Sequence, residues 1–487
     1  MRDLLRDRTG YDAIVCGGGT GGPVIAAKLV EGGARVLLLE AGPDHGPRTS
    51  GRWPAELLDA ATIPTSHGWG YLSEDGRALA FERAKVIGGC SAHNGCTVSW
   101  GHRADYDGWG LAGWSADELQ PLFAEASRRL RVRRFAEDEL TPWHEGFIAA
   151  GEELGLPRLD LLESLDVVPS VCAEPSNSPE GVRWNAAFAY LDPVRDRPTL
   201  EIRGNTLVDR ILVERGRAMG VRAVRDGIVE ELAADLVVCS GGTYGSPAML
   251  LRSGIGPADD LAALGIEVVA DLPAVGGNLH DHPAYELFYD ASDELERRTM
   301  AFAATGRSVP DEQGFASVAS SVADDGLVDL HVISEISMDG RLGIFVACVT
   351  PRSRGRLRLR SADPTAAPIV DHAYLTDPDG RDLAVLTDGI GIARSFADTR
   401  ALRPLVRRET HPGVETDMSA VIPKEVIHYW HPVGTCAMGS VTDARGRIVG
   451  VERLVVADAS VMPRTVRATT NLPTVVLAER IAGWLAA

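Results

Sequence analysis

The sequence predicts an α/β fold, α+β overall, in which a Rossmann-like domain is joined to a discontinuous second domain built on an antiparallel sheet backed by helices. Two observations carry this prediction. An apolar strand, a glycine-rich turn and a helix follow one another within residues 12–31, the order of a dinucleotide-binding unit. From about residue 285 to 423, alternating segments are interrupted by helical stretches, a pattern typical of antiparallel sheets.

The glycine-rich turn has the spacing G-x-G-x-x-G, formed by Gly17, Gly19 and Gly22. The first glycine permits a tight turn, the second lets a pyrophosphate approach the backbone, and the third allows close packing of helix and strand. The helix, predicted over 23–31, presents free N–H groups and its positive dipole end to the phosphates. A second strand delivers Glu40, whose carboxylate can accept a hydrogen bond from a ribose 2′-hydroxyl. An acid here disfavours NADP, but the motif alone does not distinguish FAD from NAD.

The acidic composition excludes several classes of partner. The 487 residues carry a net charge of −19 with no offsetting basic cluster, so neither nucleic acid nor an anionic membrane is expected as a partner. No apolar run is long enough to span a bilayer. Residues 1–11 are too few and too charged to form a secretory signal, so we expect a cytoplasmic protein. The seven cysteines are scattered, and we expect them to be buried thiols.

The remaining elements are predicted in chain order from hydrophobic periodicity. In the first domain they are a strand over 36–39, helices over 114–134 and 142–155, strands over 200–213, 220–232, 235–240 and 454–457, and a closing helix over 473–485. In the second domain they are antiparallel strands over 328–336, 343–350 and 355–360, and a helix over 379–396.

Two segments outside these elements are expected to lie against a ligand. An irregular stretch rich in Gly, Pro and Trp runs to residue 79 and is expected to wrap over a site. The segment 83–96 combines a basic start, paired glycines and small polar residues. We predict a loop whose backbone lies close to a flat or charged ligand and which enters a helix near Ser91.

Together, residues 11–22, 40–42 and 83–94 resemble the glucose–methanol–choline (GMC) family of FAD-dependent oxidoreductases. The resemblance continues in the family's order through residues 242–256, 275–283, 352–355, 431–435 and 457–460. It therefore spans nearly the whole chain, and it implies FAD rather than NAD. It also implies an FAD-binding domain over 1–165, 200–284 and 424–487, and a substrate-binding domain over 166–199 and 285–423.

The resemblance implies a set of residues around FAD, including a backbone contact from Val208. The set is Gly17, Gly19, Thr20, Gly22, Glu40, Ala41, Val86, Gly89, His93, Asn94, Gly95, Val208, Trp430, Asp458, Ala459, Pro473 and Thr474. His93 is unusual, because most members of the family have an apolar residue there, whereas the choline oxidase type has a histidine bonded to the flavin 8α-methyl group. Two interpretations stay open, a covalent histidyl–FAD bond and a non-covalent contact with the ring edge.

Oxidation of an alcohol by a flavin needs a base for the hydroxyl proton, a donor that holds the oxygen, and a carbon that faces the flavin N5. By resemblance, His431 is the base, and Asn471 is the donor that holds the oxygen. Histidine suits the base because its ordinary pKa of ~6.5 needs only a modest shift to keep it neutral. The amide of Asn471 can donate without titrating, and the alternative for this residue is a helix N-cap before Pro473. The pair resembles the choline oxidase and 5-hydroxymethylfurfural oxidase type.

Four further residues allow two interpretations each. Trp430 is expected to border the alcohol pocket and to favour flat aryl or furanic alcohols, unless it packs beneath its loop. Glu335 is a candidate carboxylate for a choline-like cation, but a solvated face of a strand is the favoured interpretation. His280 and His282 have a spacing that mimics a metal site, yet they are interpreted as a structural turn, so no metal is predicted.

The sequence thus predicts FAD-dependent oxidation of a primary alcohol to an aldehyde, with electrons passing to O2 or another acceptor. Two other classes stay open. One is a lyase of the same fold, like a hydroxynitrile lyase, that keeps FAD without redox turnover. The other is a non-catalytic flavin-binding protein, which two competent catalytic positions argue against. The sequence leaves open the specific alcohol, the acceptor and the oligomeric state.

Overall fold

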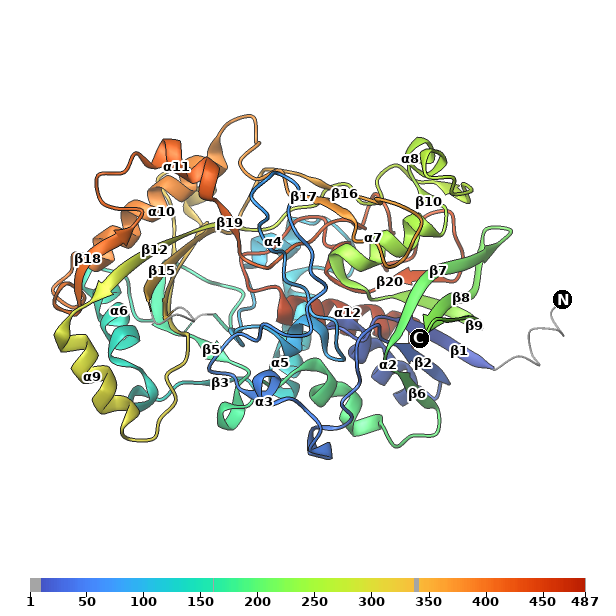
Figure 1. Ribbon diagram of the computed structural model, residues 1–487, viewed down its shortest axis with the longest axis horizontal. Coiled ribbons are helices and arrows are strands. Elements are labelled where there is room, and N and C mark those ends of the chain that lie inside the picture. The colour runs from blue at the N-terminus through green and yellow to red at the C-terminus, as the bar shows by residue number, and fades with distance from the viewer. Residues whose placement is uncertain (1–9, 161, 337–340, 487) are drawn as a thin grey trace.

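The computed structural model describes residues 10–160, 162–336 and 341–486, and these form two lobes (Figure 1). Each lobe is built around a seven-stranded sheet. The predicted combination of a Rossmann-like unit with an antiparallel sheet backed by helices is confirmed.

The first sheet has the strand order β6-β2-β1-β9-β8-β7, with β20 also paired to β9. Its strands are β1 Tyr11–Cys16, β2 Val36–Leu39, β6 Leu200–Arg203, β7 Thr206–Glu214, β8 Arg217–Arg225, β9 Ile228–Cys239 and β20 Leu454–Val456. One part of this sheet is parallel and consists of β6, β2, β1, β9 and β20. On the other side of β9 the sheet is antiparallel, because β8 pairs with β9 and β7 pairs with β8 in that direction. Helices α2 Gly21–Glu31 and α12 Asn471–Ala486 pack against each other beside this sheet (Figure 1).

Two predicted strand boundaries in this lobe are wrong, and both errors arise at turns. A turn at Asp226 and Gly227, both at positive φ, separates β8 from β9, and β9 then continues unbroken to Cys239. An Asp-Gly pair between alternating segments is a strong hairpin signal, so this turn was available in the sequence. Asn205, at a φ of 52°, likewise divides the predicted strand 200–213 into β6 and β7.

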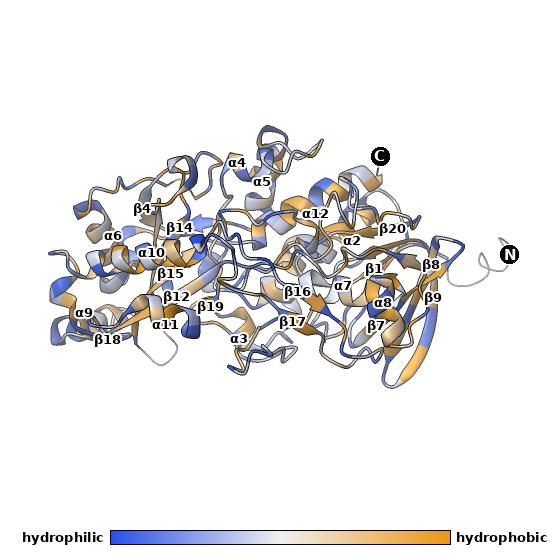
Figure 2. Ribbon diagram, turned by 90° about the horizontal axis from the view of Figure 1, so that it is seen from above, coloured by the Kyte–Doolittle hydropathy of each residue, from blue (hydrophilic) through white to orange (hydrophobic). Residues whose placement is uncertain are grey.

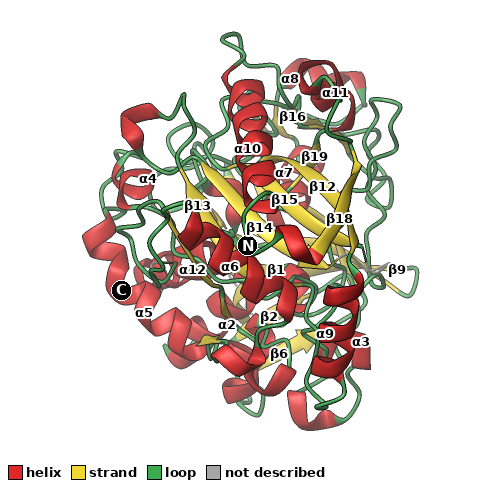
Figure 3. Cartoon of the chain, turned by 90° about the vertical axis from the view of Figure 1, so that its left-hand side faces the viewer, coloured by secondary structure: helices red, strands yellow, loops and turns green. Residues whose placement is uncertain are grey.

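The second sheet is antiparallel, with the order β18-β12-β15-β14-β13-β4, and β19 also pairs with β12. Its strands are β4 Ser170–Ala173, β12 Pro283–Ala291, β13 Glu312–Val318, β14 Leu330–Ile336, β15 Leu342–Cys348, β18 Val406–His411 and β19 Ile427–His428. Helices α6 Pro142–Glu153 and α10 Arg381–Ala397 cover one face of it (Figure 3). Helix α9 Asp293–Ala303 packs against α6, and helix α11 Met418–Glu425 packs against α10. The other face carries a small apolar cluster around Phe345 and Tyr429.

One predicted strand of the second domain belongs elsewhere. β16 Arg356–Arg358 pairs with β17 Ile369–Asp371 in a separate two-stranded sheet, and its Leu357 is part of the first lobe's core. Conversely, α6 packs in the core of the second lobe. Both elements therefore cross the domain division implied by the family resemblance, and that division stays a prediction.

The remaining elements are short, apart from the helices α5 and α7. They are α3 Ala55–Leu58, α4 Arg103–Asp107, α5 Ala116–Arg129, α7 Gly242–Arg252 and α8 Ala258–Ala263, with strands β3 Arg133–Arg134, β5 Pro175–Ser176, β10 Ile255–Gly256 and β11 Ala270–Asp271. Apolar residues are concentrated in the inner strands and in α2 and α12 (Figure 2). Across the described residues, none of the helices combines the length and the apolar character that crossing a membrane requires.

Candidate active site

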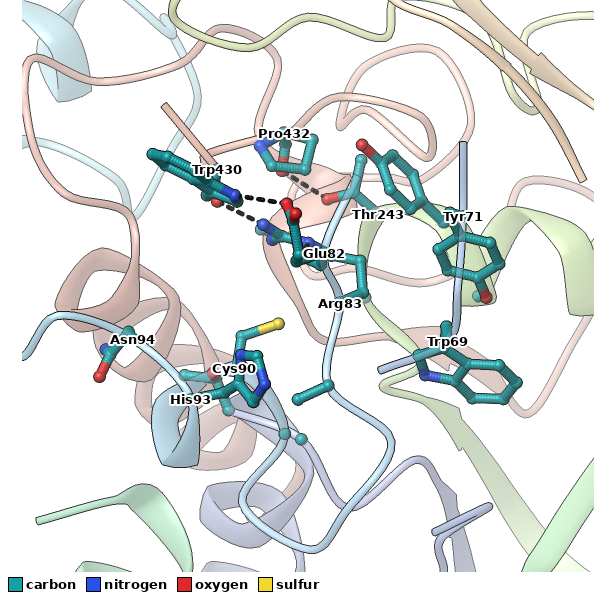
Figure 4. Close-up of a pocket in the computed structure, with 18 of the residues that line it drawn as sticks. Trp69, Tyr71, Glu82, Arg83, Cys90, His93, Asn94, Thr243, Trp430 and Pro432 are labelled. Carbon is teal, nitrogen blue, oxygen red and sulfur yellow. Dashed lines mark hydrogen bonds between the residues drawn. The ribbon is translucent and has the colours of Figure 1, made fainter. Parts of the chain in front are cut away.

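A cavity of about 680 Å³ runs from the glycine-rich turn after β1 to the inner face of the antiparallel sheet. At one end it is lined by Gly17 and Gly19, and at the other by Glu335 and Phe345. The irregular segment before residue 79 contributes residues that include Trp69 and Tyr71, so it wraps over the cavity as expected (Figure 4).

The three glycines of the first turn differ in what surrounds them. Gly17 has a φ of 109°, and a Cβ there would lie 2.4 Å from the Ser240 carbonyl oxygen. A Cβ on Gly22 would lie 1.9 Å from the Gly17 carbonyl oxygen, so α2 can approach the turn only without a side chain at this position. Gly19 has no other atom closer than 3.9 Å to its Cβ position, which leaves its backbone open to a ligand.

Glu40 is buried at the carboxyl end of β2 and lines the cavity. Its Oε2 accepts the N–H of Gly18 and its Oε1 accepts the N–H of Gly42, both at 2.8 Å. Burial raises the pKa of this carboxyl to about 7, against the lowering effect of these N–H groups. Each oxygen retains a lone pair, so the carboxylate can also accept hydroxyl groups of a ribose.

The second glycine-rich loop packs directly on the first. Gly88 donates its N–H to the Gly18 carbonyl at 2.7 Å, and a Cβ on Gly89 would lie 2.5 Å from the Gly19 Cα. The helix expected near Ser91 is only a four-residue 3-10 helix, Gly89–Ala92. Gly88 and Gly89 are both at positive φ, so a regular helix cannot include them.

His93 follows this 3-10 helix and lines the cavity (Figure 4). Its Nε2 lies 2.8 Å from the Ser66 carbonyl oxygen, and burial lowers the pKa of the ring. A carbonyl oxygen can only accept, so the neutral ring carries its hydrogen on Nε2 and keeps a lone pair on Nδ1.

His431 also lines the cavity, and its backbone is fixed by Asp281. Asp281 Oδ1 accepts the N–H of His431 at 2.9 Å and the N–H of His282 at 2.7 Å. Burial lowers the pKa of His431 well below its usual value, and the neighbouring His282 and Arg83 lower it further. The imidazole is therefore neutral near pH 7, as a general base must be.

Asn471 is the first residue of α12, and it lines the same cavity. Its Oδ1 accepts a hydrogen bond from the Thr20 hydroxyl at 3.4 Å, whereas its Nδ2 is buried without a partner. The N-cap alternative is not supported, since this side chain makes its bond to Thr20 rather than to a backbone N–H. A buried amide without an acceptor is costly, which indicates that a ligand oxygen completes the site.

Trp430 borders the cavity instead of packing beneath its loop, and 37% of it is exposed. Its Nε1 donates to Glu82 Oε2 at 2.7 Å, and Arg83 donates from Nη2 to the Trp430 carbonyl at 3.0 Å (Figure 4). These two bonds hold the residue at a φ of 59°, a backbone conformation that residues other than glycine seldom adopt.

Carboxylates line the cavity where it meets the antiparallel sheet. Glu286, Glu312 and Glu335 come from β12, β13 and β14, and Glu312 lies opposite Glu335 in the strand register. The expectation that Glu335 lies on a solvated face is wrong, because this half-buried residue lines the cavity. Burial and the neighbouring Glu286 and Glu312 raise its pKa well above the usual value. Burial also raises the pKa of Glu312 to about 7. We name this group, Glu286, Glu312 and Glu335, the carboxylate wall.

Most of the predicted cofactor residues come together in this one cavity. Those that line it are Gly17, Gly19, Thr20, Glu40, Ala41, Gly89, His93, Asn94, Gly95, Val208, Trp430, Asp458, Ala459 and Thr474. Gly22, Val86 and Pro473 are buried outside the lining.

His280 and His282, interpreted from the sequence as one structural turn, have different surroundings. His280 bonds to the Asn278 carbonyl at 2.7 Å and accepts the N–H of Thr465 at 2.9 Å, as a structural residue does. His282 instead contacts His431, with 3.2 Å between the two Nδ1 atoms. That contact joins positions 149 residues apart, so no local pattern announces it. Within the described ranges, no group of three or more His, Cys, Asp or Glu residues is arranged to hold a metal ion.

Comparisons with known proteins agree with this architecture. Two family profiles described as GMC oxidoreductase match residues 11–284 and residues 351–478. The chain is 32% identical to mitochondrial choline dehydrogenase of Homo sapiens, over 98% of this chain and 89% of that protein. It is also 32% identical to choline oxidase of Arthrobacter globiformis, over 98% and 94%. Among solved structures, pyridoxine 4-oxidase from "Mesorbium loti" is similar at 28% identity and a TM-score of 0.87, over 98% and 99% of the two chains.

The packing of Gly22 predicts that the Gly22→Ala variant loses FAD. The new methyl group would overpack the contact between α2 and the turn, at a cost of about 1–3 kcal/mol in stability. A turn displaced to relieve this clash no longer fits the pyrophosphate, so FAD should bind at least about tenfold more weakly. The measurement is the flavin-to-protein ratio after exhaustive dialysis. Gly391→Ala is the control, because this exposed position in α10 has no atom within 4 Å of its Cβ site. Full FAD retention by Gly22→Ala would contradict the prediction.

Proposed function

This chain belongs to the GMC oxidoreductase family, and from that premise we propose that it oxidises positively charged primary alcohols to aldehydes, with FAD as the hydride acceptor. The observation that carries the proposal is one cavity that holds a neutral histidine, an unpartnered amide and the carboxylate wall. The choline dehydrogenase and choline oxidase relatives support the substrate class, because choline is a primary alcohol with a quaternary ammonium group.

The residues of the cavity fit FAD. Glu40 would accept the hydroxyls of the adenosine ribose, and the open backbone at Gly19 with the amino terminus of α2 would receive the pyrophosphate. Beyond them, the loop around Gly89 and His93 would lie against the flavin. When bound, FAD supplies the hydride acceptor, which is regenerated by O2 or another electron acceptor.

In this proposal, the proton of the alcohol goes to His431. Because its pKa is lowered by burial, the ring is neutral and can accept a proton at the pH where the enzyme works. The Nδ2 group of Asn471 donates a hydrogen bond to the substrate oxygen and stabilises negative charge that develops there. Each side chain therefore supplies one of the two functions that alkoxide formation requires.

The positive group of the substrate would lie at the carboxylate wall, in the part of the cavity that aromatic rings also line. Tyr429 lies 4.2 Å from His431 and 4.9 Å from Phe345, measured between ring centroids. Trp430 stacks on Phe345 at 6.4 Å. Aromatic faces attract cations, and carboxylates add a full negative charge, so this side of the cavity favours a cation over a neutral furanic or aryl group.

We expect His431→Ala to slow flavin reduction by about 10²–10⁴-fold, the usual contribution of a general base. The measurement is anaerobic stopped-flow reduction at a saturating concentration of choline, with flavin absorbance reporting that FAD stays bound. His411→Ala is the matched control, since His411 bonds to Tyr285 on β12 and is not among the residues that line the cavity. A reduction rate within a few fold of the unmodified protein would refute the role of His431 as base.

We expect Glu312→Gln to weaken the binding of choline by at least about tenfold, and to leave the binding of its neutral isostere 3,3-dimethylbutan-1-ol nearly unchanged. The pKa of Glu312 is raised to about 7, so this carboxyl is charged above that pH and neutral below it. Choline affinity should therefore fall as the pH drops through about 7, with no such change for the isostere. Glu415→Gln, on the exposed surface, is the control. Equal losses for both alcohols would exclude charge recognition.

We further propose that His93 is bonded covalently to FAD. Precipitation with trichloroacetic acid should then leave the flavin in the protein pellet, and His93→Ala should release it into the supernatant. The neutral ring with a free lone pair on one nitrogen is the form that such a bond requires. A colourless pellet from the unmodified protein would rule the bond out.

A further inference from the structure

His282 is the side chain that contacts His431 from behind the cavity. It lies immediately before β12 and is fully buried. The two rings are nearly perpendicular, at 82°, with centroids 5.3 Å apart and the two Nδ1 atoms at 3.2 Å. Since Asp281 Oδ1 accepts the backbone N–H of both histidines, the spacing of the two rings is fixed by the backbone as well as by the ring contact.

The surroundings of His282 determine which nitrogen of that ring carries hydrogen. Burial lowers its pKa to about 3, so the ring is neutral and has one N–H group. Its Nε2 lies 3.0 Å from the Thr465 hydroxyl, and the backbone of the adjoining Val466 raises the pKa of the ring, as a carbonyl near a ring N–H does. Since Nε2 is the ring nitrogen on the Thr465–Val466 side, and a carbonyl there can only accept, we assign the hydrogen to Nε2, so that Nδ1 of His282 presents a lone pair to His431.

The hydrogen of neutral His431 is then assigned as well. A hydrogen bond between two ring nitrogens needs one N–H and one lone pair, so Nδ1 of His431 must be the donor. Its Nε2 is left without hydrogen. Of the two tautomers of a neutral imidazole, only this one leaves the Nε2 nitrogen able to accept a proton.

We propose that His282 is a positioning residue that selects the His431 tautomer with a free Nε2, and that this nitrogen takes the substrate proton. This inference rests on the proposed role of His431 as base. In that step the O–H bond of the alcohol breaks and the Nε2–H bond forms, while the electron pair stays on the oxygen. Nothing is oxidised until hydride leaves the carbon. The imidazolium that results keeps its Nδ1–H bond to His282, which shares the new positive charge.

The other titratable and charged groups near this pair come from several elements. They are Asp281 before β12, His331 on β14, His428 on β19, Tyr429 after it, and Arg83 on the second glycine-rich loop. Among the residues that the structure describes, none of these groups makes a hydrogen bond to His431 Nδ1, so the tautomer depends on His282.

The direct test is ¹⁵N NMR of the holoenzyme labelled with ¹⁵N-histidine, in which His431→Ala identifies the signals of that ring. We expect His431 to carry its hydrogen on Nδ1 in the unmodified protein at pH 7. In the His282→Leu variant, which lacks an acceptor, the two tautomers should mix. Finding the hydrogen on Nε2 in the unmodified protein overturns the proposal, whatever the variants do.

Kinetics provide the second test, with two variants of His282. His282→Leu should slow anaerobic flavin reduction by about 10–100-fold and leave the Kd of choline unchanged, because this side chain does not touch the substrate. His282→Asn should recover most of the rate, since its amide oxygen can take the place of the Nδ1 lone pair. His411→Leu is the control.

The outcomes separate this inference from the proposed function. A normal rate of flavin reduction in His431→Ala would refute the role of His431 as base, and the proposed function with it. Slow reduction by His431→Ala together with normal reduction by a fully flavinylated His282→Leu leaves the function intact and overturns the positioning role alone. Equal losses in His282→Leu and His282→Asn also overturn it, because the hydrogen-bond acceptor would then be irrelevant.

Discussion

The contact between the two glycine-rich loops is the constraint on which the site depends. Gly88 and Gly18 are joined by a backbone hydrogen bond, and Gly89 lies so close to Gly19 that a single methyl group would separate them. Two segments about 70 residues apart thereby form one continuous backbone surface. The 3-10 helix and His93 follow this contact directly in the chain, so the contact fixes where that segment begins.

The antiparallel sheet contributes the other half of the cavity through its register. Glu312 and Glu335 are directly opposite each other, and Glu286 comes from the same sheet two strands further along. Because side chains alternate along a strand, a shift of one residue in any of these strands would turn its carboxylate to the face covered by α6 and α10. The hydrophobic packing of that far face therefore fixes the chemistry of the near face.

Local backbone constraints explain which features could be predicted from the sequence. The β1–α2 unit and Glu40 were predictable, since an apolar strand, a glycine-rich turn and a helix follow one another within a short local segment. The direction of Glu335 was not, because period-two alternation shows that two faces exist but not which one is buried. The contact of His282 with His431 was hidden for a different reason, since it depends on two chain segments meeting at Asp281 in the folded protein.

Burial acts in opposite directions on the two ends of the substrate pocket. It lowers the pKa of His431, which keeps a base neutral, and it raises the pKa of the carboxylate wall, which makes that wall costly to ionise. A neutral base needs no counter-ion, whereas the charged form of the wall is stabilised by positive charge, as the lowering effect of Arg341 on the pKa of Glu286 and Glu335 shows. A substrate with a hydroxyl at one end and a positive charge at the other satisfies both ends at once. By linkage, a cation that binds the ionised wall also lowers the pKa of its carboxyls, so the substrate itself favours the charged form of the site that recognises it.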